Sequence, residues 1–159
     1  MDGAAEVRRI EYDNGFYLGP VGLDGKTEEG RGMFVWKTGE LYVGDFRAGL
    51  RTGRGTLTWP DGTEYEGDFL EDRRTGRGRL RWPSGDWYQG DFRDGVRTGQ
   101  GAMHWASGER YQGAFDAGQM EGIGTHFRAD GTSDYCGLWV RGCPVGKGGR
   151  QVYDGGDQK

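Results

Sequence analysis

The sequence predicts an all-β fold, a single-layer twisted antiparallel sheet of about six consecutive β-hairpins that forms an elongated trough. Composition is the first observation behind this: glycine fills 34 of 159 positions, aromatic residues make up 13%, and proline occurs only 4 times. The second is a repeat, because tyrosine recurs at 42, 65, 88 and 111 with a constant step of 23. The third is an alternation of apolar and polar residues after each tyrosine, which is typical of strands.

Each repeat carries the same residues at fixed offsets. Glycine follows each tyrosine by two positions, an apolar residue by four, and a Gly-x-Gly begins seven positions after that. The tyrosine series extends back to Tyr17 and forward to Tyr135, which gives six units. We therefore expect a lead-in over 1–16, the repeat array over 17–155 and a tail over 156–159.

The unit that begins at Tyr65 shows why each should be a hairpin. Its first strand should run from Tyr65 to Phe69, where apolar residues alternate with Glu66 and Asp68. Its second strand should run from Gly76 to Trp82, joined to the first by a loop over 70–75. A Pro-Ser-Gly turn then leads to the next unit, so successive hairpins pair edge to edge and give about twelve strands.

The glycines should give the aromatic rings room to lie against the sheet. Gly67 and Gly78 fall on the aromatic face, and without a Cβ they let the Tyr65 ring lie flat over the backbone. We expect Gly76 to serve in the same way. The opposite face should be polar and solvated, with Asp68 near Arg54 or Arg77.

The end units depart from the repeat, as the capping units of a linear array do. In the first unit the interval from Val21 to Gly30 is nine residues, not seven. The fifth unit has His126 where its neighbours have Leu or Met, which we interpret as a filler of that apolar position. The last unit has Val152 in the place of tryptophan.

The overall charge argues against several classes of partner. A formal net charge of −4 disfavours sequence-independent binding of nucleic acid and of acidic membrane surfaces. The chain shows no apolar run long enough to span a membrane and no signal-peptide core, and two cysteines do not make a disulfide framework. These features favour a cytoplasmic or cytoskeletal protein.

The recurring "RTGRG" at Arg51–Gly55 and 74–78 could indicate a specific ligand-binding function, as a phosphate loop or as an RNA-binding arginine–glycine box. A phosphate loop needs a following helix, whereas here a strand is expected. The glycines are also in register with a sheet, which disfavours the RNA box. No catalytic grouping and no metal-ligand spacing occurs, so we expect no enzyme activity, cofactor or metal.

Two stretches, "YVGDFRAGLRTGRGTLTWPDG" and "YEGDFLEDRRTGRGRLRWPSG", resemble MORN (membrane occupation and recognition nexus) repeats, whose pattern is Y-x-G-x-[FW]-x-x-G-x-x-x-G-x-G. Asp72 replaces one loop glycine of that pattern. The resemblance covers most of the chain. It implies a non-enzymatic module that binds other molecules.

A narrower resemblance concerns the two ends of the array. The closing "GCPVGKGGRQVYDGG" and the stretched first unit are similar to those of radial spoke head MORN proteins of motile cilia. This implies a structural subunit of the axoneme that packs against other spoke head subunits or a second MORN chain, as a homo- or heterodimer. The alternatives are an adaptor that tethers a partner to phospholipid membrane, and one that serves another cytoskeletal structure.

Two sets of residues are candidates for binding a partner. A single-layer sheet leaves its aromatic face open, and exposed aromatic residues are frequent interface anchors. We expect a trough that accepts an extended or helical segment or a second copy, lined by Trp36, Tyr42, Trp59, Tyr65, Trp82, Tyr88, Trp105 and Tyr111. Arginines in the hairpin loops, at one long edge of the sheet, are candidates for docking an acidic partner, against the alternative of ordinary solvated loops: Arg51, Arg74 and Arg97.

Overall fold

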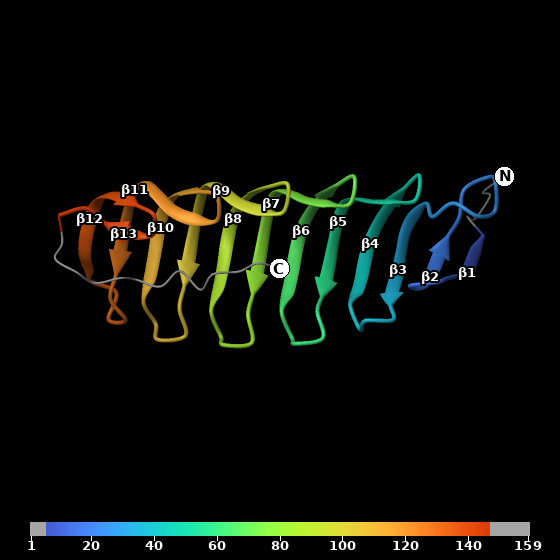
Figure 1. The fold of residues 1–159 in the computed structure, drawn as a ribbon, viewed down its shortest axis with the longest axis horizontal. Helices are drawn as coiled ribbons and strands as arrows, with labels where there is room; N and C mark the ends of the chain where they lie inside the picture. The colour runs from blue at the N-terminus through green and yellow to red at the C-terminus, as the bar shows by residue number, and fades with distance from the viewer. Residues whose placement is uncertain (1–5, 147–159) are drawn as a thin grey trace.

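The computed structural model describes residues 6–146, and within this range the chain forms one antiparallel sheet of 13 strands in chain order. Figure 1 shows the strands side by side in a single layer, from β1 at one end to β12 and β13 at the other. The all-β, single-layer prediction is confirmed. The strands are β1 (Val7–Tyr12), β2 (Gly15–Pro20), β3 (Gly30–Trp36), β4 (Leu41–Arg47), β5 (Leu50–Thr58), β6 (Glu64–Leu70), β7 (Arg73–Arg81), β8 (Trp87–Arg93), β9 (Val96–His104), β10 (Arg110–Asp116), β11 (Gln119–Phe127), β12 (Ser133–Val140) and β13 (Cys143–Pro144).

Two kinds of turn connect the strands. Within a unit the turn has two residues with positive φ, such as Asp94 (49°) and Gly95 (82°), which is the backbone of a type I′ turn. Between units the chain closes a longer turn, in which the Gly62 amide donates to the Trp59 carbonyl at 3.0 Å. The first kind makes the loops shorter than predicted, because β6 ends at Leu70 and β7 already begins at Arg73.

The tyrosine rings and the glycines opposite them hold the aromatic face together. A Cβ at Gly78 would lie 2.4 Å from Cε2 of Tyr65, so the ring occupies the space that a side chain would need. Gly67 and Gly78 are direct partners in the sheet, as predicted. The Tyr65 hydroxyl donates to the Asp68 carbonyl at 2.9 Å and fixes the ring along the strand.

Gly76 has a different role from the one expected. Its φ is +54°, and a Cβ there would lie 2.7 Å from the carboxylate of Asp68, not against a ring. The ladder shifts register between Gly67 and Asp68, which marks a β-bulge. Gly76 therefore permits the bulge that re-aims the strand, and only Gly78 accommodates the tyrosine.

The sheet begins earlier than the first tyrosine unit. The predicted lead-in over 1–16 contains β1, whose residues pair with β2 from Val7 with Pro20 to Tyr12 with Gly15. This accounts for 13 strands where about twelve were expected. The stretched first unit forms a loop over 21–29 that is closed by a bridge between Val21 and Glu28. Most of the last unit, including Val152, and the tail over 156–159 lie outside the described residues.

Candidate partner-binding surface

The predicted trough tyrosines form the core of the sheet. Tyr42, Tyr65, Tyr88 and Tyr111 are each 0% exposed. Phenylalanines flank each ring edge-on, and Tyr65 lies 5.2 Å from Phe69 and 5.1 Å from Phe92 between ring centroids. These tyrosines are brought together as predicted, but the structure buries their rings and leaves no surface of theirs for a partner to touch.

Burial changes the acidity of the tyrosines. It raises the pKa of Tyr42 and of Tyr111 to about 12, since the ionised phenolate is poorly solvated inside the sheet. The same desolvation raises the pKa of Tyr65 and Tyr88 further. The tyrosines therefore remain neutral hydrogen-bond donors throughout the physiological range.

The tryptophans predicted for the trough are the half-buried residues of this face. Trp36 ends β3, and the other three directly follow β5, β7 and β9, before the turn to the next unit: Trp59, Trp82 and Trp105. Their spacing is set by the hairpin, because successive tryptophans are two strands apart in the sheet. They form a single row along the molecule, and we call this set the tryptophan row.

Each of the first three tryptophans meets an arginine from the start of a strand two places farther along the sheet. The Arg51 guanidinium carbon lies 5.4 Å from the ring centre of Trp36, 5.7 Å from Tyr42 and 5.5 Å from Phe69. Arg74 and Arg97 repeat this arrangement over Trp59 and Trp82 at 5.5 Å each. Each arginine and tryptophan together cover the buried tyrosine beneath them.

This placement corrects the expectation that these arginines lie in loops at the sheet edge. Arg51, Arg74 and Arg97 belong to β5, β7 and β9, and Arg97 is only 5% exposed. The Arg51 side chain is 18% exposed and its Nε donates to the Asp72 carboxylate at 3.0 Å. The loops are two residues long, so the arginines fall inside the strands, where their side chains pack against the aromatic rings. Their docking role stays a prediction.

Arg51, Arg74 and Arg97 occupy one column of the repeat, a set of positions 23 residues apart. The same step places Glu28 before them and Met120 after them in this column, and both are buried. Met120 is 0% exposed in the unit where Tyr111 and Trp139 provide the rings. A long side chain is thus required here to cover the tyrosine, and a charge is not. The constant step would have identified this column from the sequence.

Between the first two tryptophans of the row the surface is hollowed. The groove between Trp36 and Trp59 has a volume of about 250 Å³, and Leu57 and Arg51 also line it. Thr38 and Glu40 complete its wall at the turn. Two indole rings and an aliphatic side chain thus line this groove together with polar groups, as in many sites that bind a ligand.

The opposite face carries ion pairs along the middle units, as predicted, whereas along the first units the apolar residues Leu18, Met33 and Val43 lie opposite one another on it. Arg54 and Asp68 approach within 3.9 Å, and Arg77 and Asp91 within 3.5 Å, across neighbouring strands. Farther along, Trp87 stacks on His104 with ring centres 3.6 Å apart. Desolvation, followed by the nearby arginines, lowers the pKa of His104. Trp87 is thus the counterpart, on the opposite face, of the tryptophan row.

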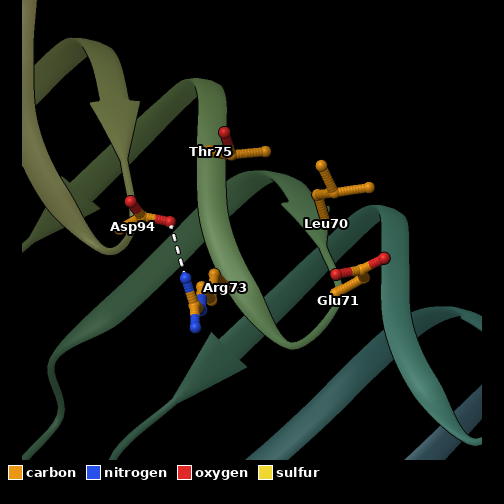
Figure 2. Close-up of a pocket in the computed structure, with 5 residues that line it drawn as sticks. All are labelled: Leu70, Glu71, Arg73, Thr75 and Asp94. Carbon is orange, nitrogen blue, oxygen red and sulfur yellow. Dashed lines mark hydrogen bonds and ion pairs between the residues drawn. The ribbon is translucent and has the colours of Figure 1, made fainter.

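At the hairpin-turn edge, a small hollow of about 140 Å³ is lined by five residues of two adjacent hairpins. Figure 2 shows Arg73 of β7 directed toward Asp94 in the β8–β9 turn, and their side chains bond at 3.1 Å. Asp94 lies in the turn itself, so the ion pair ties one hairpin to the next. The side chain of Arg73 is largely in solvent, at 68% exposed.

His126 fills the apolar column as interpreted from the sequence. It is 5% exposed and pairs across the sheet with Tyr111 and Tyr135. Its Nδ1 lies 2.6 Å from the Asp134 carboxylate, a partner that the sequence did not indicate. The pair fixes the ring below Trp105, 5.9 Å away between centroids, and so completes the C-terminal end of the aromatic face.

Residues 6–146 hold no group of three or more His, Cys, Asp or Glu side chains placed to bind a metal ion. Cys136 and Cys143 are free thiols. The same stretch has no helix with the length and apolar character needed to cross a bilayer.

Comparison with known families identifies MORN repeats at residues 42–64, 65–87, 88–110 and 111–133. A search of the curated proteins finds no match.

Among solved structures, the chain is similar to the TCP domain of Drosophila melanogaster SAS-4 in complex with a proline-rich motif of Ana2, with 13% identity, a TM-score of 0.39, and 87% of this chain and 94% of that one covered. It is also similar to the TCP10 domain of Danio rerio CPAP in complex with a STIL peptide, with 13% identity, a TM-score of 0.36, and 80% and 67% covered. Likenesses this remote carry no argument about function.

Proposed function

Because the chain belongs to the family of MORN-repeat proteins, we propose that it is a structural subunit of the radial spoke head in a motile cilium or flagellum. A role in protein interaction follows from the family, because MORN repeats are typically non-enzymatic modules of protein interaction. The observation that carries the proposal is the tryptophan row, a line of half-buried aromatic residues along one face of a continuous sheet. Aromatic residues of this kind are the usual anchors of protein interfaces.

Two features of the ends support the narrower assignment. The closing "GCPVGKGGRQVYDGG" resembles the end of radial spoke head MORN proteins, although most of it lies outside the described residues. The stretched first unit has a structure of its own, in which Asp24 accepts hydrogen bonds from the amides of Lys26 and Thr27 at 2.9 Å each. The extra residues thus make an ordered turn beside the start of the array.

In this proposal the partners are other spoke head subunits or a second MORN chain, and the place of action is the axoneme. A rigid single-layer sheet suits the role, because it offers a long surface without closing around its partner. The tryptophan row would contact the partner, while the ion-paired face would remain in solvent. The net charge of −4 supports protein over an acidic lipid surface.

A pull-down from demembranated axonemes tests the assignment. The tagged chain should recover spoke head subunits, identified by mass spectrometry, and recovery of other cytoskeletal proteins without them would overturn the placement. Sedimentation with vesicles of phosphatidylserine and phosphatidylcholine tests the membrane alternative. Strong, salt-sensitive binding to the vesicles would make lipid tethering the primary function.

A further inference from the structure

The tryptophan row has the period of a polyproline II helix. We propose that it binds a proline-rich segment of a partner protein in that conformation, lying along the row. This inference rests on the proposed function, since it names the kind of segment that the scaffold would hold. Three observations carry it: the spacing of the row, the indole donors of Trp36, Trp59 and Trp82, which are unpaired within the described residues, and the groove between Trp36 and Trp59.

The spacing comes from the sheet itself. Trp36, Trp59, Trp82 and Trp105 are separated by two strands each, and strands lie about 4.8 Å apart, so the period is about 9.6 Å. A polyproline II helix has three residues per turn and rises about 3.1 Å per residue, so the same face returns about every 9.3 Å. Across the whole row the mismatch amounts to only about 1 Å.

The other regular conformations fit less well. An extended strand presents the same face every second residue, about 6.7 Å, and its residues three apart point to opposite sides. An α-helix returns to one face after seven residues, or about 10.5 Å, and is out of step by about 3 Å at the end of the row. The spacing therefore favours the polyproline II helix among the three.

The donors suit this ligand. In the described part of the chain, no hydrogen-bond partner occurs for the indole N–H of Trp36, Trp59 or Trp82, whereas Trp139 donates its own to the Gly124 carbonyl at 3.1 Å. A polyproline II segment leaves its backbone carbonyls without internal hydrogen bonds. One indole N–H per turn of ligand could thus meet one carbonyl, which is how aromatic grooves recognise proline-rich segments elsewhere.

The groove between the first two tryptophans gives a proline ring a place. The hollow between Trp36 and Trp59 has a volume of about 250 Å³ and is lined by Leu57 below. Leu80 and Met103 occupy the place of Leu57 between the later tryptophans. Each turn of the ligand would insert apolar rings between two indoles while its carbonyls face the indole edges.

The test uses the whole chain and a synthetic oligoproline of twelve residues, about 37 Å long in this conformation. The six tryptophans give six indole N–H signals in a ¹H–¹⁵N NMR spectrum. Titration should shift the signals of Trp36, Trp59 and Trp82 in a saturable manner and leave Trp87, on the opposite face, unchanged. Six-residue oligoproline should bind more weakly, and a glycine–serine peptide of twelve residues should not bind.

Two matched variants sharpen the result. Trp59→Phe keeps an aromatic ring over the core but removes one donor, and it should weaken oligoproline binding about two- to tenfold. Trp87→Phe makes the same change on the opposite face, where the ring stacks on His104, and should leave binding unaltered. Equal effects of the two variants, no shift at millimolar oligoproline, or tighter binding of an amphipathic helical peptide would overturn the inference.

The outcome is separable from that of the proposed function. If oligoproline does not bind but Trp59→Phe reduces recovery of spoke head subunits, this inference fails and the scaffold role stands. If oligoproline binds and no spoke head subunit is recovered, the recognition of proline-rich segments stands and the axonemal placement fails.

Discussion

Replacing Gly78 by alanine places a methyl group where the Tyr65 ring lies. The added carbon would be 2.4 Å from Cε2 and 2.5 Å from the hydroxyl oxygen of that ring, well inside van der Waals contact. The ring has little freedom to move, because Phe69 and Phe92 pack edge-on at 5.2 and 5.1 Å and the hydroxyl bonds the Asp68 carbonyl. The substitution must therefore displace a fully buried side chain.

The magnitude follows from two opposing effects. Overpacking a core costs about 1–3 kcal/mol, and loss of the tyrosine hydrogen bond adds about 0.5–1.5 kcal/mol. Replacing glycine by alanine in a strand stabilises the folded state by about 0.5–1 kcal/mol, because alanine loses less conformational entropy on folding. We expect a net decrease of about 0.5–4 kcal/mol in the free energy of unfolding, against a total of about 5–15 kcal/mol for a typical domain.

Urea denaturation followed by circular dichroism measures this decrease. Gly22→Ala is the matched control, since its added carbon would meet nothing closer than 3.6 Å, and it should be neutral or slightly stabilising. Gly55, Gly101 and Gly124 have the same contact with their tyrosines and should respond as Gly78 does. A Gly78→Ala variant as stable as the wild type would refute the idea that glycine is needed to make room for the rings.

Three further predictions concern the arginine column, the tyrosines and one turn. In urea denaturation, Arg97→Met should lower the free energy of unfolding by less than about 1.5 kcal/mol, because Met120 fills the equivalent place. Arg97→Ala should lower it by about 1–3 kcal/mol, because it uncovers Tyr88. Equal decreases for the two variants would show that the charge of Arg97 matters more than its covering of the tyrosine. Unfolded tyrosines lose their protons near pH 10, whereas burial raises the pKa of Tyr42 and Tyr111 to about 12, so stability should be complete below pH 10 and fall between about pH 10 and 12. Phenolate absorbance should then rise together with loss of circular dichroism, and tyrosines that ionise gradually in an intact sheet would contradict the burial. Glu71→Asn should raise the unfolding free energy by up to about 1 kcal/mol, because Glu71 has a φ of 45° in a turn that favours asparagine, and an unchanged urea midpoint would argue against strain there.

The step of 23 residues was enough to predict the hairpins, the single layer and the glycine partner of each tyrosine. Strand alternation places Tyr65, Gly67 and Phe69 on one face, and this follows from the sequence because a strand has a period of two. The ion pair of Arg54 with Asp68 was expected for the same reason. These features depend on neighbours in one or two adjacent strands, which a constant repeat specifies.

What the sequence did not show depends on bends within a strand. The bulge at Gly76 changes where the following residues point, and glycine spacing alone did not separate it from Gly78. Arg74 and Trp59 come from opposite ends of their strands and meet above Tyr65, a contact that the alternation of residues along a strand does not predict. The tyrosines consequently became core, and the tryptophans alone remained as the surface.

The length of the hairpin turns was also missed. Glu71 and Asp72 form a two-residue turn although neither is glycine, and Asp72 is held there because its carboxylate accepts the Arg51 amide at 2.9 Å. That contact comes from the preceding hairpin, 21 residues earlier in the chain. Local turn propensity could not reveal this contact. The two-residue turns before β5, β7 and β9 place Arg51, Arg74 and Arg97 within the strands.

Photo-crosslinking is the most direct test that this face of the sheet holds a partner. A benzophenone amino acid is placed at Trp59 in the tryptophan row, and in a second variant at Trp87 on the opposite face. After irradiation in axonemal extract, the account predicts adducts with spoke head subunits from position 59 and none from position 87. Adducts that form only from position 87, or equally from both, would contradict it.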